Sequence, residues 1–360
     1  MSDRRITSLL AVWMALAPTG IAQEVYTEAD SITFSETLNI GAILDGLEDG
    51  QFRDGGQTSF THNLGAVGVR WKGFDIAAIA RFDYVADYNS DTIALLIGAD
   101  NGFELSDGDF DVDLRVNRAA AFGARLGYQK SLFRDRVTLS AFSSLLATSA
   151  LQDGSLTGNL TLSDDQNDIE GALELDYVFS NDIIFDNEVD APNGFGISFD
   201  LRAEARLTQN LTARIDIGDI WSRIWWDDAP GTVATASTSN VTTNPDGTIS
   251  VSPFLSGQNF TEDTTTRYFA RTHAELTWTA TDRWTFSQDV FNIRSATLST
   301  SRAHYRVFDD LSLSFEVEWA TRGVGFGFAW RGLHARFATD NFDLDDARYL
   351  RANLGYSLKF

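Results

Sequence analysis

The chain has 360 residues, 43% of them hydrophobic, and a formal net charge of −23. This composition belongs to a packed protein and not to a disordered one, and the excess of acids argues against nucleic acid as a partner. Mean hydropathy is −0.15, and no apolar run reaches the roughly 18 residues of a membrane-spanning helix. Cysteine is absent and proline occurs 5 times, which suits long strands held together without disulfides.

Residues 1–22 are predicted to be a secretory signal peptide, and residues 23–360 a single mature domain. Arg4 and Arg5 supply the positive start, residues 9–17 form a short apolar run, and Gly20 and Ala22 place small side chains before the cleavage point. The apolar run is too short for a membrane anchor. The sequence therefore predicts an exported protein.

Beyond residue 30, apolar and polar residues alternate with a period of two. In 194–207, apolar residues from Phe195 to Leu207 alternate with polar or small residues from Gly196 to Arg206, and 74–88, 110–128 and 311–319 repeat the pattern. Strands of a soluble sandwich average about 5–6 residues, whereas a tilted membrane-spanning strand needs about 9–11. These longer segments favour a barrel with its apolar face toward lipid and its polar face toward the lumen.

Short and long connections alternate along the chain, as expected for short periplasmic turns and long extracellular loops. We therefore predict an all-β fold, a closed antiparallel transmembrane β-barrel of 16 strands. Merging the weakest pair, at 154–180, into a loop would leave 14. The predicted strands are 31–45, 58–71, 74–88, 109–129, 136–149, 154–164, 167–180, 194–207, 211–225, 265–280, 283–296, 298–306, 310–319, 323–330, 333–339 and 347–360.

Aromatic residues cluster at both ends of these segments, as in the two interfacial girdles of a membrane barrel. One set lies next to the short turns and the other at the opposite strand ends. The first is Trp71, Phe74, Tyr128, Trp284, Trp330 and Phe360, and the second is Tyr84, Tyr88, Trp225, Trp226, Tyr268 and Trp319.

The last segment, 347–360, alternates from Leu350 to Leu358 and stops at Phe360. This resembles the terminal-strand signature of Gram-negative outer-membrane barrels, which the barrel-assembly machinery recognises. The mature chain is also similar in style to porin-like and fatty-acid-transporter-like barrels, without the defining motif of one family. The resemblance implies the cell outer membrane, with its lipid and lipopolysaccharide as partners, and leaves a homo-oligomer open.

The polar phase predicts a charged lumen, because an arginine facing lipid at mid-membrane costs about 2–4 kcal/mol. Mixed arginines and acids suit either a constriction that sorts small polar solutes or a structural network that fills the interior. The predicted pore-lining residues are Arg81, Asp83, Asp113, Arg115, Arg125, Asp200, Arg202, Glu204, Arg206, Arg214, Asp216, Arg271, Glu275, Arg302, Arg306, Glu316, Glu318 and Arg336.

The acids Asp107, Asp109, Asp111 and Asp113 lie at one strand entrance and form a weak candidate for cation binding. A solvated strand extension is the favoured explanation of these acids, so we assign no metal and no cofactor. More generally, the acids of the loops serve solubility or bind lipopolysaccharide through divalent cations. Residues 226–264, rich in Thr and Ser, either fold into the mouth or form a mobile loop.

None of the four histidines (His62, His273, His304 and His334) has a serine two residues later, the arrangement of outer-membrane phospholipases. We therefore do not expect an enzyme. The leading prediction is a porin-like channel for passive passage of small hydrophilic solutes. The alternative is a structural or adhesive barrel with a lumen closed by charge pairs, followed by an enzyme at the barrel rim.

Overall fold

The computed structural model describes residues 23–41, 56–101, 107–162, 169–182, 187–238, 241–243, 249–251 and 254–360. The predicted signal peptide lies outside these residues. Within them, no helix has both the length and the apolar character needed to cross a bilayer.

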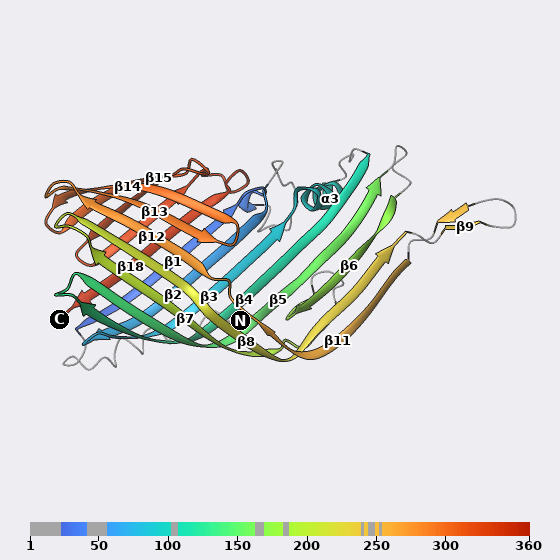
Figure 1. Cartoon of the computed structure of the whole chain (residues 1–360), viewed down its shortest axis with the longest axis horizontal. Coiled ribbons are helices and arrows are strands. Elements are labelled where there is room, and N and C mark those ends of the chain that lie inside the picture. The colour runs from blue at the N-terminus through green and yellow to red at the C-terminus, as the bar shows by residue number, and fades with distance from the viewer. Residues whose placement is uncertain are drawn as a thin grey trace.

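Fourteen antiparallel strands close into a ring in which the last strand pairs with the first (Figure 1). The ring therefore has no open edge, and strands paired on both sides meet the condition for crossing a membrane with strands. In ring order the strands are β1 (Glu24–Ser35), β2 (Thr58–Trp71), β3 (Phe74–Tyr88), β4 (Gly108–Leu132), β5 (Val137–Leu162), β7 (Asn193–Arg206), β8 (Leu211–Ser237), β12 (Arg271–Thr279), β13 (Trp284–Ile293), β14 (Ala296–Phe308), β15 (Leu311–Glu318), β16 (Val324–Trp330), β17 (Leu333–Thr339) and β18 (Tyr349–Lys359).

Two further strands extend the wall on one side of the ring. β6 (Ile169–Phe179) pairs with β5 and β8 beyond the end of β7, and β11 (Phe254–Thr266) pairs with β8 beyond the end of β12. The wall is consequently tall from β4 to β11 and short from β12 to β17, as Figure 1 shows. We call the tall part, beyond the ends of β7 and β12, the extension.

The remaining elements are small and lie at the end of the molecule that carries the extension (Figure 1). Helix α3 (Ser90–Asn101) packs on the outer face of the wall, where Ile93 contacts Ala86 and Tyr88. Strands β9 (Val241–Thr243) and β10 (Ile249–Val251) form a separate two-stranded sheet.

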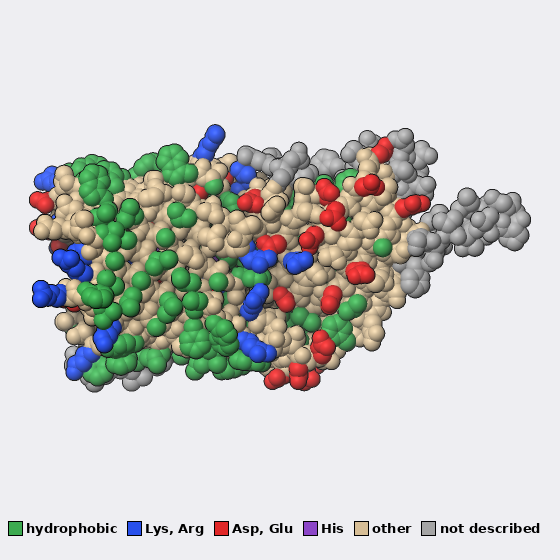
Figure 2. Space-filling view, in the orientation of Figure 1, with side chains coloured by type: hydrophobic (Ala, Val, Ile, Leu, Met, Phe, Trp, Pro, Cys, Tyr) green, Lys and Arg blue, Asp and Glu red, His purple; other side chains and the backbone are tan. Residues whose placement is uncertain are grey.

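The outward face of the ring carries an apolar band, since Phe122, Phe326 and Trp319 are more than half exposed. On the face drawn in Figure 2, hydrophobic side chains gather over the part of the molecule away from the extension, whereas acidic side chains are the commoner charged groups on the extension. The band identifies the part of the wall that meets lipid.

The structure confirms the closed antiparallel barrel, with 16 strands in the sheet and 14 in the ring. Several boundaries differ from those predicted. The first strand is 24–35 and not 31–45, the predicted strands 136–149 and 154–164 form one continuous β5, and β11 occupies part of the predicted loop 226–264. The prediction that Trp226 and Tyr268 belong to the aromatic girdle at the strand ends opposite the short turns is wrong, because both side chains are buried on the inner side of the wall.

Candidate functional site: the lumen

The lumen at its middle height contains a first layer of ion pairs, centred on Asp219 of β8. Arg81 of β3 donates two hydrogen bonds to this carboxylate, Nη1 to Oδ1 at 2.7 Å and Nη2 to Oδ2 at 2.6 Å. Arg271 of β12 also pairs with Asp219, and Ser198 Oγ donates to Oδ1 at 2.5 Å. Since β4, β5 and β7 separate β3 from β8 in the ring, the Arg81–Asp219 pair crosses the lumen.

The environment of Arg81 holds its guanidinium in place. Its central carbon lies 3.7 Å from the ring centroid of Tyr268, and Arg81 also pairs with Asp83 of its own strand. Asp83 in turn lies 2.6 Å from Nδ1 of His62 on β2. Buried charges are tolerated only when their hydrogen-bonding groups are satisfied, and this layer meets that condition for both carboxylates.

A second layer is centred on Arg302 of β14, which donates to Glu316 at 2.7 Å and to Asp289 at 3.0 Å. Arg351 of β18 donates to Asp289 at 3.4 Å, and Arg336 of β17 lies 3.8 Å from Glu316. Four strands separate β13, which carries Asp289, from β18, so this layer also joins non-neighbouring parts of the wall.

The tip of the β13–β14 hairpin crosses the mouth of the ring and contacts β2 and β3. Arg294 donates to Asp87 of β3 at 2.7 Å, and the hydroxyls of Ser295 and Thr58 lie 2.5 Å apart. Below this contact, the ring of Phe291 packs against Phe60 of β2 with centroids 5.6 Å apart. These contacts join nearly opposite parts of the ring.

An apolar cluster inside the mouth accompanies these contacts and was not expected from the sequence. Its members come from β1, β2, β3, β13, β14, β17 and β18, and all are buried. They are Ile32, Phe34, Phe60, Val85, Phe291, Ile293, Ala296, Leu298, Ala338 and Tyr349. Their side chains occupy lumen-facing positions, so the inner wall is polar in its middle and apolar toward the mouth.

A chamber of about 780 Å³ runs along the lumen beside the ion-pair layers, and Arg271 and Arg351 line part of it. Gln23, Gly73 and Lys359 lie at the end of the chamber near the short turns, and Ile32 and Phe291 lie at its far end. Its wall is charged: Arg202 and Arg214 both pair with Asp216, and Arg125 Nη2 donates to the Tyr26 hydroxyl at 3.0 Å. The chamber can hold water and small polar molecules.

Most of the predicted pore-lining residues lie on the inner face and enter these layers or the chamber wall. The structure brings together Arg81, Asp83, Arg125, Asp200, Arg202, Arg214, Asp216, Arg271, Glu275, Arg302, Glu316 and Arg336. Asp200 belongs to this set because it accepts a hydrogen bond from the backbone N–H of Asp219 at 2.7 Å.

The other predicted residues lie elsewhere. Asp113 and Arg115 pair with each other on the extension, and Glu318 accepts hydrogen bonds from the backbone of the 319–323 turn. Glu204, Arg206 and Arg306 are exposed near the short turns and form no ion pair with another described residue.

Sequence reasoning missed two buried lumen carboxylates, Asp289 in the second layer and Asp219 in the first. Asp219 shows why. Leu211, Ala213, Ile215 and Ile217 point outward, so unbroken alternation would place Asp219 against lipid. Instead the backbone adopts φ 51° at Asp219, and the register with β7 shifts between Phe199 and Leu201. The bulge turns the carboxylate inward. An acid on the apolar phase of a strand was the available signal.

The candidate cation ladder does not converge on one point. Asp109 accepts a hydrogen bond from Thr161 at 2.7 Å, and Asp113 pairs with Arg115 at 3.3 Å. Among the described residues, no group of three or more acidic or histidine side chains is arranged to hold a metal ion.

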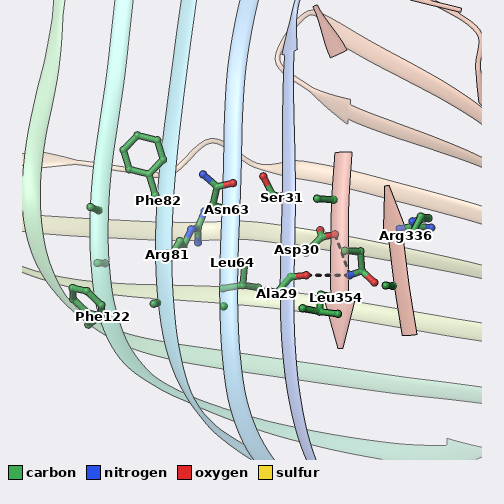
Figure 3. A pocket seen from close by; sticks show the side chains of 17 residues that line it. Ala29, Asp30, Ser31, Asn63, Leu64, Arg81, Phe82, Phe122, Arg336 and Leu354 are labelled. Carbon is green, nitrogen blue, oxygen red and sulfur yellow. Dashed lines mark hydrogen bonds between the residues drawn. The ribbon is translucent and has the colours of Figure 1, made fainter. Parts of the chain in front are cut away.

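A second hollow, of about 700 Å³, lies on the outer face of the wall across β17, β18 and β1 to β4. Figure 3 shows it with Phe82 and Phe122 on one side and Leu354 on the other. Its floor consists of small outward-facing residues such as Ala29, Gly65 and Ala80. The hollow belongs to the lipid-facing surface and is separate from the lumen.

No family model matches the chain, and no curated protein matches it. Among solved structures, it is similar to a mutant of the monoaromatic hydrocarbon channel TodX, with a TM-score of 0.48 and 13% identity over 96% of this chain and 92% of that one. It is also similar to the Ralstonia pickettii toluene transporter TbuX, with a TM-score of 0.45 and 11% identity over 96% and 93% of the two chains. A mutant porin of Rh. blastica gives a TM-score of 0.25 and 10% identity over 93% and 99%. Inferences about function therefore rest on the geometry of this chain.

Proposed function

We propose that this chain is an outer-membrane channel for small hydrophilic solutes, with a lumen narrowed by ion pairs that cross it. The observation that carries the proposal is the charged chamber of about 780 Å³, which leads to the Arg81–Asp219 pair. A barrel that served only as a scaffold would not need a water-accessible chamber lined by arginines and carboxylates. The proposal includes no catalytic role and no cofactor.

Opposed positive and negative groups around a narrow passage create a transverse field. Such a field orients a dipolar solute and rejects an apolar one that cannot replace water at these groups. We therefore expect zwitterionic or hydroxylated molecules to pass more readily than hydrocarbons of the same size.

Conductance in a planar bilayer and swelling of liposomes test this function. The purified barrel is expected to give discrete current steps and to admit small amino acids or sugars. Replacing Asp219 by Asn is expected to enlarge the steps, because Arg81 loses the carboxylate that holds it across the lumen and Arg271 loses its partner on the neighbouring strand.

The second candidate is a structural barrel, favoured by the apolar cluster and the Arg294–Asp87 contact at the mouth. It predicts silence in the bilayer and no swelling for the wild type and for Asp219→Asn alike. That joint silence would contradict the channel proposal.

A further inference from the structure

Two arginines point outward from the wall into the aromatic girdle next to the extension. Arg118 of β4 pairs in register with Tyr84 of β3, and its guanidinium carbon lies 5.4 Å from the ring centroid of Phe82. Arg223 of β8 pairs in register with Ile197 and lies 5.4 Å from the ring centroid of Trp225. Tyr84, Phe82, Ile197 and Trp225 belong to the outward phase of their strands, opposite the lumen-facing Asp83 and Ser198.

Both arginines lie at the far edge of the apolar band. Arg118 precedes Tyr128 by ten residues on β4, which corresponds to a height of about 25 Å for a strand tilted in a membrane barrel. That height equals the apolar band of such barrels. Arg223 lies between Trp221 and Trp225, and Figure 2 shows basic side chains at the boundary between the apolar band and the acidic extension.

Neither guanidinium forms a hydrogen bond or an ion pair with another described residue, although Nε of Arg118 is shielded from solvent. Arginines that face the lumen are different, because Arg81 and Arg302 each contact two or more carboxylates. The aromatic ring beside each outward guanidinium restrains its plane, while the N–H groups of its two Nη atoms remain available. Such a planar fork matches two oxygens of a phosphate.

We propose that Arg118 and Arg223 bind phosphate groups of lipopolysaccharide in the outer leaflet. Lipid phosphates lie at the boundary where the apolar band ends, which is the height of both guanidinium groups. The acidic side chains farther along the extension repel phosphate. Binding therefore depends on the two arginines and not on the net charge of the surface. The inference rests on the outer-membrane location in the proposed function, but it does not require an open lumen.

Thermal unfolding of the purified full chain in detergent tests the proposal, with three separate additions: lipopolysaccharide, dephosphorylated lipopolysaccharide and inorganic phosphate. The unfolding temperature is expected to rise with intact lipopolysaccharide and to stay unchanged with the other two. Arg118→Gln and Arg223→Gln should each raise the lipopolysaccharide concentration needed for half of the shift by about tenfold, the effect of one lost charge-assisted contact.

Lys130→Gln is the matched control, because Lys130 lies on the outward phase of β4 at the end near the short turns. Lys130→Gln should leave the rise in unfolding temperature with lipopolysaccharide unchanged. The double lysine variant, Arg118→Lys/Arg223→Lys, should show more of this rise than the double glutamine variant, because lysine keeps the charge. An unchanged response in Arg118→Gln/Arg223→Gln, or equal stabilisation by dephosphorylated lipopolysaccharide, would overturn the proposal. Should the glutamine variants not fold, the comparison of intact and dephosphorylated lipid on the wild type still decides. A silent bilayer recording with normal lipid binding contradicts the channel alone.

Discussion

At the scale of single residues, Asp219 controls the middle of the lumen through an unusual backbone conformation. A non-glycine residue at φ 51° is uncommon, and Asn and Asp tolerate this region better than most other residues. The local bulge carries the carboxylate to the inner face, where Arg81 and Arg271 meet it. One irregular residue of β8 thereby provides the carboxylate at which the first layer of ion pairs meets.

Asp219→Asn should preserve the bulge but lose the charge. Leaving two arginines around a neutral amide in a buried site is expected to cost about 3–5 kcal/mol, measured as a fall in unfolding stability in detergent together with larger current steps. Asp228→Asn is the control, because Asp228 has φ 50° on the same strand and forms no ion pair with any described residue. Equal effects of the two substitutions would show that the ion pairs are unimportant.

Gly194, the second residue of β7, illustrates packing at the inner wall. A Cβ at this position would overlap Thr148 Oγ1 and approach the ring of Trp226 to 2.5 Å. Gly194→Ala should therefore destabilise the barrel by about 1–3 kcal/mol through overpacking, detected by thermal unfolding. Gly196→Ala on the same strand should cost less, since its nearest contact would be Ile224 Cγ1 at 3.3 Å.

At the scale of elements, the β13–β14 hairpin acts as a cover over part of the mouth. Arg294 and Asp87 are partly exposed, so their pair contributes no more than about 1 kcal/mol, or about fivefold in an open-to-closed ratio. The apolar contacts beneath, such as Phe60 with Phe291, supply the remaining attraction.

Asp87→Asn and Arg294→Asn should each increase the fraction of time for which a bilayer recording shows current, by about fivefold. The double variant should resemble each single one, because both remove the same contact. Exchanging the charges, in Asp87→Arg/Arg294→Asp, should recover part of the closed state. Additive effects in the double variant would mean that the pair does not hold the hairpin.

The strands themselves were largely predictable from the sequence, and the irregular places were not. Alternation determines the phase of β3, β7 and β15 directly, since one face carries large apolar side chains. It does not reveal that β5 continues through a bulge. Nor does it reveal that β6 and β7 lie end to end between the same two neighbours, β5 and β8. Those outcomes depend on pairing between distant strands, which local periodicity does not contain.

At the scale of the whole molecule, the polar lumen was predicted and its apolar mouth was not. Arginine is so costly against lipid that its phase identifies the inner face. An apolar side chain is tolerated both against lipid and inside a closed interior, so Ile32, Phe60 and Phe291 gave no signal of which side they occupy. Their burial follows from contacts across the ring.

The arrangement of the two ends predicts which sites are accessible on a living cell. The chain contains no cysteine, so a thiol reagent would label only a cysteine introduced by mutation. The side chain of Leu255 on β11 is 66% exposed. A cysteine in its place, Leu255→Cys, should react with a membrane-impermeant maleimide on intact cells. Phe133 lies in a short turn at the other end, and its side chain is 75% exposed. Phe133→Cys should react only after the outer membrane is permeabilised. The opposite result would reverse the assigned orientation.

The break between β6 and β7 has a practical consequence. β6 and β7 each form their own hydrogen bonds with β5 and β8. The pairing register of either strand therefore does not depend on residues 187–192, which lie between them. A peptide epitope spliced between Val189 and Asp190 should leave the ring intact and provide a handle for antibodies on the cell surface.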